Sequence, residues 1–521
     1  MQQLFNPPPC ASTGKRGGTV SYLTPRSRCV ASVISLLTFL FFPAIAAAHT
    51  VNLSWDASTS PNIVGYNIYR GANSNGPYTK INSALDPNTN YSDTTVQSGE
   101  TYYYVTTAVD NQGVESAYSN QSEATIPGGG SGSENVVYNF AGGSDPKLPY
   151  AGLIFDKSGN LYGTTELGGS NSQGTVFEIT PNSNGSWTET VLYNFTGSTD
   201  GGQPYGSLVF DAAGNLYGTT NFGGSANCNM GCGTIFKLTP GSAGWTETVL
   251  YTFTGGSDGR EPYARLLFDG GGNLYGTTLL GGNIGSVCSS GCGTVFKLTP
   301  GSSGWTESVL YAFHGAADGA SPYDGLVFDG SGNLYGTAGA GGASGCGVIF
   351  KLSPGSSRWT ERVLHAFKGV GDGKYSYGDL ILDSTGNLYG TAYQGGAGYG
   401  VVFELMLNTN GRWTEKALHT FSNAPAGNPV AGLVMDTAGN LYGTVMLGAT
   451  ETSCGDGCGS LFKLSPVSGG SWTYKMVHVF GQGTDGYHPT GDLILDSAGN
   501  LYGTTQAGGV QRSGMVFEIM H

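Results

Sequence analysis

The sequence predicts an all-β protein in which a small β-sandwich precedes seven four-stranded sheets, closed into a seven-bladed β-propeller. Three observations lead to this prediction. The phrase Gly-Asn-Leu-Tyr-Gly-Thr occurs seven times, each repeat contains four short strand-like segments, and the two ends of the repeat array complement each other. The copies are 53 to 60 residues apart, a period typical of repeated small sheets. They begin at Gly159, Gly214, Gly272, Gly332, Gly386, Gly439 and Gly499.

The composition agrees with short strands joined by tight turns. Of the 521 residues, 89 are glycine and 53 are tyrosine or phenylalanine, whereas only 11% are charged. Such proportions are typical of all-β repeat proteins. The chain is also too apolar and too regularly patterned to be disordered.

Residues 1–48 differ from the rest and are predicted to be a signal peptide. Four basic residues precede an apolar run over residues 30–45, and three alanines follow it. This is the layout of a secretory leader with small residues at its cleavage site. The alternative is an uncleaved membrane anchor, because the apolar run is close to the length that spans a bilayer. We expect cleavage, and no stable membrane association afterwards.

Removal of the leader leaves a strongly acidic chain. The full chain has 22 Lys and Arg against 36 Asp and Glu, and loss of the four basic leader residues leaves 18 against 36, a formal charge of −18. Such a surface repels phosphate backbones and anionic membranes, so no nucleic-acid partner is expected. The protein is expected to be a monomer that is secreted, periplasmic or on the cell surface.

Residues 49–127 contain no copy of the phrase and are predicted to form the β-sandwich. Three segments within them alternate apolar and polar residues, as half-buried strands do. The stretch resembles a fibronectin type III domain, on the basis of Trp55 in Leu-Ser-Trp-Asp, the segment Gly-Tyr-Asn-Ile-Tyr-Arg and the segment Gly-Glu-Thr-Tyr. The resemblance implies a seven-stranded spacer or accessory domain in which Tyr102 is the corner tyrosine. Residues 128–133 form a flexible Gly/Ser linker.

Residues 134–521 are predicted to form the propeller. Each repeat reads as a four-stranded antiparallel meander, because Gly, Pro, Asn, Asp and Ser separate its segments. The array begins with residues 136–140, which match the fourth segment of a repeat, and ends after residues 515–519, which match the third. Pairing these two segments would complete the seventh sheet with one strand from the start and three from the end. An open stack would instead need caps over its exposed edges.

The repeat resembles the GloVer-type tandem repeat of choice-of-anchor bacterial proteins. The resemblance extends from about residue 136 to the C-terminus and rests on three phrases that recur in order: Gly-Asn-Leu-Tyr-Gly-Thr-Thr, Gly-Thr-Val-Phe-Lys-Leu-Thr-Pro and Trp-Thr-Glu-Thr-Val-Leu-Tyr. It implies this architecture and a surface setting, and no particular activity. The chain stops two residues after its last predicted strand, which favours free secretion or a periplasmic location over anchoring.

An aspartate closes the first strand of every repeat and has two interpretations. Calcium favours carboxylate oxygens, whereas a hairpin turn uses the carboxylate to accept backbone N–H groups. One carboxylate per turn is too few for a calcium site, so we expect turns and no metal. These residues are Asp156, Asp211, Asp269, Asp329, Asp383, Asp436 and Asp496.

A second set of residues is predicted to surround one mouth of the propeller. The loop that enters each repeat carries an aspartate and, five residues later, a tyrosine, and all these loops cross the same face. Aromatic rings beside carboxylates suit carbohydrate or a cationic group; the alternative is that they only pack and cap identical loops. Pro425 and Val430 in the sixth repeat and Thr490 in the seventh would make the mouth asymmetric. The predicted ligand-binding residues are Asp145, Tyr150, Asp200, Tyr205, Asp258, Tyr263, Asp318, Tyr323, Asp372, Tyr377 and Asp485.

Cysteines occur as pairs four residues apart in the connector between the second and third strands. Zinc normally needs four ligands, and each pair offers two with no histidine beside it. In an oxidising compartment, local disulfides are therefore expected. Cys346 stands alone in a shortened loop and is expected to be a free thiol, unless it pairs between molecules. The pairs are Cys228/Cys232, Cys288/Cys292 and Cys454/Cys458.

Histidines and tryptophans in the fourth strands are interpreted as structural. His365, His419 and His478 replace a tyrosine of the Tyr193 type, which we interpret as variation of the repeat. Six tryptophans begin fourth strands and are expected to form a belt near the outer edge. They are Trp187, Trp245, Trp305, Trp359, Trp413 and Trp472.

The predicted function is that of a secreted, non-catalytic protein whose propeller mouth binds a glycan or an extracellular protein partner, without a cofactor. No Ser/His/Asp order, histidine pair or phosphate loop in the sequence indicates catalysis. The alternatives are an extracellular glycan-processing hydrolase or lyase that uses aspartates of the mouth, and a purely structural surface component. Glycosidic cleavage needs two carboxylates roughly 5 to 9.5 Å apart. Buried, close carboxylates of raised pKa in one or two repeats would favour the enzyme.

Overall fold

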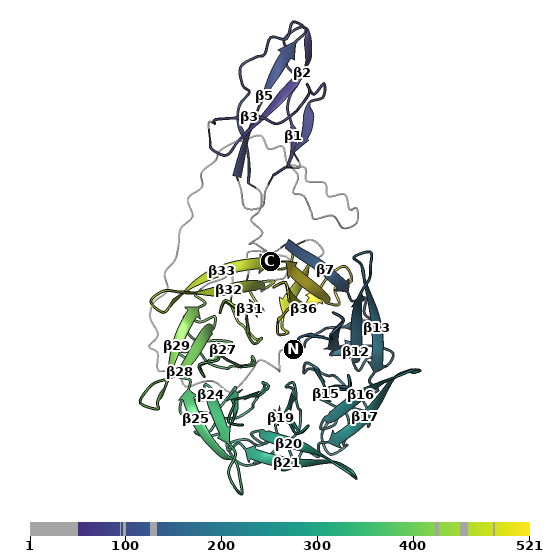
Figure 1. The fold of residues 1–521 in the computed structure, drawn as a ribbon, viewed down its shortest axis with the longest axis vertical. Helices are drawn as coiled ribbons and strands as arrows, with labels where there is room; N and C mark the ends of the chain where they lie inside the picture. The colour runs from purple at the N-terminus through teal and green to yellow at the C-terminus, as the bar shows by residue number, and fades with distance from the viewer. Residues whose placement is uncertain are drawn as a thin grey trace. The chain divides into compact units, whose positions relative to one another are not determined.

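The computed structural model of the chain describes residues 51–520 with short gaps (Figure 1). These residues contain strands and no helix, which confirms the all-β class, and none of their segments is a helix that could cross a bilayer. They form two compact units with a boundary between residues 131 and 132, within the predicted linker. The predicted leader lies outside the described residues. The internal gaps are 75, 94, 97–100, 126–132, 423–426, 449–456 and 483–484.

The first unit has two antiparallel sheets. In the smaller one β1 (Val51–Ser54) pairs with β4 (Asn90–Asp93). The larger one has the order β3 (Thr79–Lys80), β2 (Ile63–Gly71), β5 (Thr101–Asp110) and β6 (Ser122–Thr125). The described residues of this unit thus hold six strands.

Aromatic residues fill the space between these two sheets. Tyr104 on β5 packs in one apolar cluster with Leu53 on β1, and its buried hydroxyl donates to Asp93 at 3.0 Å. Trp55 meets Tyr66 edge to face, with 5.4 Å between the ring centroids. Tyr104 is therefore the tyrosine that reaches deepest into this core, whereas Tyr102, the predicted corner tyrosine, is half-buried.

The second unit contains seven sheets arranged around a common centre, six with four strands and the last with five (Figure 1). We number them first to seventh in chain order. Each is an antiparallel meander, with its short first strand near the centre and its fourth strand at the rim. The first strands are β9 (Ile154–Phe155), β14 (Val209–Phe210), β18 (Leu267–Phe268), β22 (Val327–Phe328), β26 (Ile381–Leu382), β30 (Val434–Met435) and β35 (Ile494–Leu495). The second strands are β10 (Leu161–Thr165), β15 (Leu216–Thr220), β19 (Leu274–Thr278), β23 (Leu334–Ala338), β27 (Leu388–Ala392), β31 (Leu441–Val445) and β36 (Leu501–Gly508).

The outer strands of these sheets are longer. The third strands are β12 (Thr175–Pro181), β16 (Thr234–Gly241), β20 (Thr294–Gly301), β24 (Val348–Ser353), β28 (Val401–Leu407), β32 (Ser460–Val467) and β37 (Met515–Met520). The fourth strands are β13 (Trp187–Asn194), β17 (Gly244–Thr252), β21 (Gly304–Ala312), β25 (Thr360–Ala366), β29 (Trp413–Thr420), β33 (Ser471–Val479) and β7 (Ser133–Asn139). Three short strands lie in the connectors: β8 (Pro146–Lys147) pairs with β11 (Leu167–Gly168), and β34 (Gly486–Pro489) pairs with β36 as the fifth strand of the seventh sheet.

The seventh sheet joins the two ends of the repeat array. The strand β7 pairs antiparallel with β37, with Tyr138 opposite Val516 and Val136 opposite Phe517; in Figure 1 the blue β7 lies beside the yellow C-terminal strands. The predicted pairing of these two segments is confirmed. The hydroxyl of Thr504 on β36 also donates to the carbonyl of the first sheet's Ala151 at 3.0 Å. The last repeat is therefore bonded to the first.

The aspartate that precedes each repeated phrase organises the first turn. In the second sheet, Oδ1 of Asp211 accepts the N–H groups of Ala213 and Asn215, both at 2.9 Å. Its Oδ2 accepts the side-chain amide of Asn215 at 2.6 Å and the hydroxyl of Tyr217 at 3.0 Å. The backbone and asparagine bonds recur in the other six repeats. The turn interpretation of these aspartates is confirmed.

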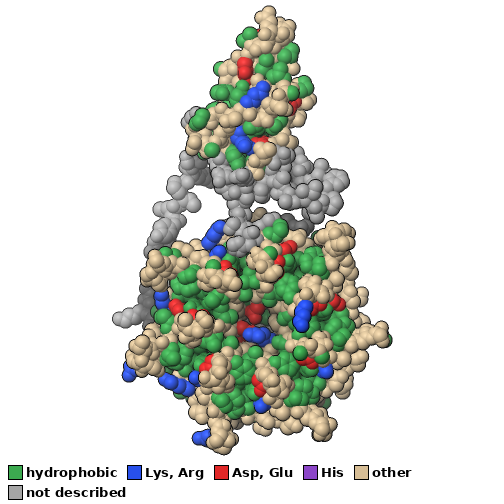
Figure 2. Space-filling view, viewed as in Figure 1, with side chains coloured by type: hydrophobic (Ala, Val, Ile, Leu, Met, Phe, Trp, Pro, Cys, Tyr) green, Lys and Arg blue, Asp and Glu red, His purple; other side chains and the backbone are tan. Residues whose placement is uncertain are grey.

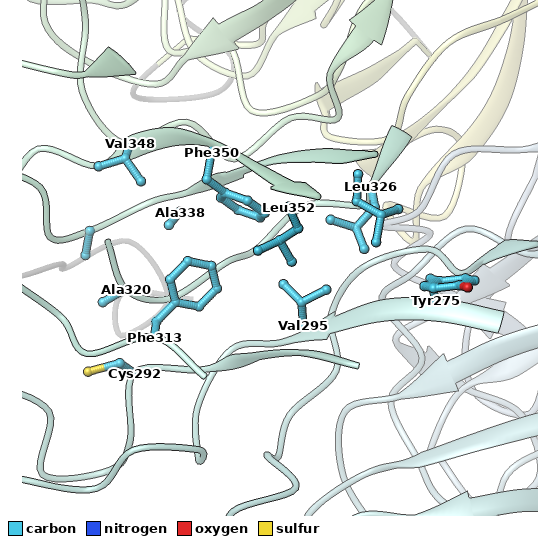
Figure 3. Packing of buried hydrophobic residues seen from close by; sticks show 12 residues of the cluster. Tyr275, Cys292, Val295, Phe313, Ala320, Leu326, Ala338, Val348, Phe350 and Leu352 are labelled. Atoms are coloured by element: carbon cyan, nitrogen blue, oxygen red, sulfur yellow. The ribbon is translucent and has the colours of Figure 1, made fainter. Parts of the chain in front are cut away.

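The second glycine of the phrase leaves room for an aromatic ring of the third strand. A Cβ atom on Gly218 would lie 2.6 Å from Cζ of Phe236, and the same approach is 2.5 to 2.8 Å in the other repeats. Figure 3 shows the environment of the equivalent Phe350, whose ring packs in one cluster with Phe313 of the preceding repeat. The phrase therefore places a buried phenylalanine between neighbouring sheets.

Two of the predicted disulfides are present, Cys228–Cys232 and Cys288–Cys292. Cys458 is also disulfide-bonded, whereas its predicted partner Cys454 lies outside the described residues. The prediction of a free thiol at Cys346 is wrong, because Cys346 is disulfide-bonded. Sequence spacing indicates only local pairs, and Cys346 has no cysteine near it in the chain.

Candidate functional site

The loops that lead into the seven first strands converge on a central cavity. The space within this cavity, counted together with the open solvent at its mouth, is ≈ 710 Å³. Each sheet contributes at least two of the three residues that precede its first buried leucine. Figure 2 shows acidic and basic side chains together in the hollow at the centre of this unit. The cavity is therefore formed by all seven repeats, and its chemistry depends on where the repeats differ.

Five tyrosines from five successive sheets line this cavity, and we call them the tyrosine arc. All five were predicted as mouth residues. Neighbouring rings contact each other at angles of 43° to 76°, with centroids 4.8 to 5.5 Å apart. The arc presents ring edges, faces and hydroxyls along one wall. Its members are Tyr150, Tyr205, Tyr263, Tyr323 and Tyr377.

The wall is not aromatic in the sixth and seventh sheets. Val430 and Thr490 hold the equivalent positions and are both buried. The hydroxyl of Thr490, from the seventh repeat, donates to the carbonyl of Tyr150, from the first repeat, at 3.3 Å. The cavity is therefore asymmetric, as the sequence predicted.

The hydroxyls of the arc are neutral at physiological pH. Burial raises the pKa of Tyr323 to about 12 and that of the other four still further. Two polar groups fix hydroxyl positions, because Asn221 donates to the hydroxyl of Tyr263 at 3.0 Å and Glu166 hydrogen-bonds Tyr205. The arc thus offers oriented phenolic hydroxyls as well as apolar ring surface.

Four charged residues complete the cavity, and we call them the charged cluster. Arg265, Asp379 and Asp492 occupy the position directly before the buried leucine, where the other repeats have Gly or Ser. Asp324 lies one residue earlier in its repeat, where the others have Ala or Gly. None of the four was predicted as a site residue, although each departs from the residue that the other repeats have at its position.

The only cation of this cluster forms an ion pair across two sheets. Nε of Arg265, from the third sheet, contacts Oδ2 of Asp379, from the fifth, with the two side chains 30% and 13% exposed. The other oxygen of Asp379 accepts the backbone N–H of Gly325 at 2.6 Å. Both oxygens of Asp379 therefore have a partner.

The two remaining carboxylates of the cluster are harder to ionise. Asp324 is only 3% exposed and accepts the hydroxyl of Thr337, and burial together with the charge of Asp379 raises its pKa well above the usual range. Burial and Asp379 also raise the pKa of Asp492 to about 6. The guanidinium of Arg265 thus interacts with Asp379 and Asp492, whereas Asp324 is next to Asp379 without a cation of its own.

Arg265→Met is expected to lower the free energy of unfolding at pH 7 by about 1–3 kcal/mol, because it leaves Asp379 without its counter-charge. The double variant Arg265→Met/Asp379→Asn should lose less than the sum of the two single changes, since the pair is removed together. Urea unfolding of the four proteins gives the interaction energy. Strict additivity would show that the pair does not contribute.

The six aspartates predicted for the mouth do not line this cavity. Asp200 accepts the N–H of Thr196 at 2.8 Å and the hydroxyl of Tyr193 at 3.1 Å, and so caps its own loop. Each of the six accepts the backbone N–H of the residue four positions before it. They serve loop structure, whereas the tyrosines that follow them in the sequence reach the cavity. The six are Asp145, Asp200, Asp258, Asp318, Asp372 and Asp485.

Each of these aspartates lies near a glutamate from the fourth strand of the next sheet, and we call the two an inter-sheet carboxylate pair. One oxygen of every such glutamate is buried without a hydrogen-bond partner. Burial is the main reason that the pKa of five of them is raised to about 7 and that of Glu134 to about 10. The five glutamates with a pKa of about 7 are Glu189, Glu247, Glu307, Glu361 and Glu415.

These features define a class: an all-β repeat protein in which seven copies of one sheet surround a cavity. The chain belongs to the Gloeobacter/Verrucomicrobia repeat family, whose model matches residues 90–287, 229–453 and 362–521. The resemblance of the repeat that the sequence predicted is confirmed by this match.

Other similarities cover parts of known proteins. A stretch of 111 residues, 21% of this chain, is 42% identical to 7% of an amylopullulanase of Thermoanaerobacter thermohydrosulfuricus. An Fn3-like protein from Clostridium thermocellum is 41% identical over 16% of this chain and 81% of that chain, with a TM-score of 0.14. The extracellular domain of BT4673 from B. thetaiotaomicron is 10% identical over 73% of this chain and 40% of that chain, with a TM-score of 0.45.

Proposed function

We propose that this chain is a secreted, non-catalytic glycan-binding protein in which a fibronectin type III-like domain precedes a seven-bladed β-propeller. The observation that carries this proposal is the convergence of the tyrosine arc and the charged cluster on one cavity. Because residues of all seven repeats line this cavity, one bound ligand would contact both groups of side chains.

The two parts of the cavity suit the two kinds of surface that a sugar presents. The apolar C–H face of a pyranose packs against aromatic rings, which the arc supplies along one wall. Sugar hydroxyls need fixed donors and acceptors, which Arg265, Asp379 and Asp492 offer at the inner positions of their sheets. The absence of tyrosine at Val430 and Thr490 would orient such a ligand.

Two further observations agree with an extracellular glycan. Local disulfides such as Cys228–Cys232 persist in oxidising compartments. The similarity of one stretch to part of an amylopullulanase is also in keeping with a protein that meets polysaccharide.

A glycan-processing enzyme is the second candidate, because Asp324, Asp379 and Asp492 line one cavity and two of them have a raised pKa. A carboxyl with a pKa near 6 suits a general acid. Binding remains the first candidate, since Asp379 is paired with Arg265 and Asp324 accepts a hydrogen bond from Thr337.

A glycan array with the full-length mature chain tests the proposal. Retention of one glycan class is expected, with binding about tenfold weaker in Tyr263→Ala, because a lost aromatic contact is worth about 1 kcal/mol or more. Tyr399→Ala is the matched control, since Tyr399 is 43% exposed and does not line the cavity. Equal retention by Tyr263→Ala would remove the cavity as the site. If the natural chain instead releases shortened glycan, and Asp492→Asn does not, the protein is a glycan-processing enzyme.

A further inference from the structure

At two of the inter-sheet carboxylate pairs, a histidine nitrogen lies within 4.8 Å of oxygens of both carboxylates. In the contact between the sixth and seventh sheets, His478 on β33 lies beside Asp485, which follows in the connecting loop, and beside Glu134 on β7. Ligand atoms of these three residues all lie within 4.8 Å of one another. Imidazole nitrogen and carboxylate oxygen are the donors of zinc-class sites.

The spacing of these atoms matches metal coordination. Nε2 of His478 is 3.5 Å from Oε2 of Glu134 and 3.2 Å from Oδ2 of Asp485. Ligands placed tetrahedrally around Zn²⁺ at about 2.0–2.1 Å are separated by about 3.3–3.4 Å. The two distances from His478 are therefore close to the edge length of a coordination tetrahedron, and the third, between the two carboxylates, is no longer than 4.8 Å.

Unpartnered buried oxygens point independently to a cation. The Asp485 side chain is only 6% exposed, and its Oδ1 is buried without a hydrogen-bond partner. Oε1 of Glu134 is likewise buried and accepts no hydrogen bond from a donor group, and the two carboxyl groups are close enough to hydrogen-bond each other when one of them is protonated. Leaving such oxygens unpaired is costly, and a divalent cation between the two carboxylates would satisfy both.

We propose that Glu134, His478 and Asp485 bind a divalent transition-metal ion of the zinc class. Because Glu134 belongs to β7, the strand that pairs with β37, the ion fastens the first strand of the repeat array to the sixth sheet. It therefore acts as a structural clamp that holds β7, the N-terminal strand that completes the seventh sheet, against the sixth sheet. This inference does not depend on the proposed glycan site.

The other histidines of the repeat provide an internal comparison. His365 has the same donors, because its Nε2 is 3.1 Å from Oδ2 of Asp372 and Glu415 completes the group. His419 has neither carboxylate: the sequence has Pro425 at the aspartate position, and Tyr474 replaces the glutamate and stacks on the imidazole, with 4.1 Å between centroids. His419 thus marks the same position without a metal-binding set.

Equilibrium dialysis of the full-length mature chain against Zn²⁺, with excess Mg²⁺ to cover surface carboxylates, tests the proposal. His478→Tyr is expected to bind one equivalent of Zn²⁺ fewer than the natural chain. His419→Tyr, the control, is expected to bind as much Zn²⁺ as the natural chain. Tyrosine holds this position in four other repeats, at Tyr138, Tyr193, Tyr251 and Tyr311, so both variants should fold.

Thermal unfolding supplies a second readout. Zn²⁺ should raise the Tm of the natural chain and of His419→Tyr by more than it raises that of His478→Tyr, and EDTA should abolish the difference. Equal zinc stoichiometry in the natural chain and His478→Tyr would overturn the proposal. In that case the carboxylates share a proton rather than an ion.

Discussion

Replacement of Phe236 by alanine is expected to lower the free energy of unfolding by about 3–5 kcal/mol, one of the largest single effects in the chain. The ring is fully buried and lies 5.1 Å from that of Phe195, centroid to centroid. It also covers Gly218 of the neighbouring strand, whose missing side chain makes the contact possible. Its removal leaves a cavity that the strands around it cannot fill. Denaturant unfolding measures the loss.

The glycine beneath the ring makes this prediction more specific than an ordinary core truncation. Gly218→Ala alone should cost about 1–3 kcal/mol, because its methyl group would collide with Phe236. In Gly218→Ala/Phe236→Ala the methyl group enters vacated space, so the double variant should lose less than the sum. Thr246→Ala, exposed on the same sheet, should change stability by no more than about 0.5 kcal/mol. Additive losses would show that the glycine is present for another reason.

Stability is expected to decline as the pH rises from about 5 to 8, because of the inter-sheet glutamates. Burial and then Asp200 raise the pKa of Glu247 from its ordinary value of 4.5 to about 7. Between these two values the folded chain binds more protons than the unfolded chain, so the free energy of unfolding falls with rising pH. The contribution is complete below about pH 4.5 and lost above about pH 7. Partial exposure reduces it to about 1 kcal/mol per residue.

Glu247→Gln should remove the contribution of one glutamate to this decline in the free energy of unfolding. The amide is neutral at every pH, so the variant should match the natural chain at pH 5 and be more stable at pH 8. Asp211→Asn is an opposite control: burial opposes the shift, but hydrogen bonds from Asn215 and Tyr217 lower the pKa of Asp211. The ionised Asp211 side chain stabilises the fold above the ordinary pKa of aspartate, and this stabilisation is lost as the pH falls and the carboxylate is protonated. Asp211→Asn should therefore lose stability at pH 7 and little at pH 3, as chemical unfolding at each pH in EDTA would show.

Local sequence determined the repeated sheets, the pairing of β7 with β37 and the tyrosine arc. These features depend on short-range patterns that recur with a fixed period. Gly218 must lack a side chain wherever a phenylalanine such as Phe236 crosses it, and Asp211 must precede its asparagine by four residues. A residue at one position of a repeat meets the same neighbours in every sheet, so the tyrosines could be assigned to one wall in advance.

Contacts between different repeats were decided only by the tertiary structure. The sequence allowed two interpretations of the six predicted mouth aspartates, ligand binding or loop capping. In the structure they cap their loops and lie against the next sheet. Asp485, for example, lies near Glu134, which comes from the other end of the array. The charged cluster joins Arg265 to Asp379 across an intervening sheet, and Cys346 is bonded although no cysteine is near it in sequence. By sequence, His478 was interpreted as variation of the repeat. It becomes a candidate metal ligand only because the fold places carboxylates beside it. The physical reason is that a period describes a residue's place within its own sheet, whereas charge, burial and coordination depend on which side chains the neighbouring sheets bring to it.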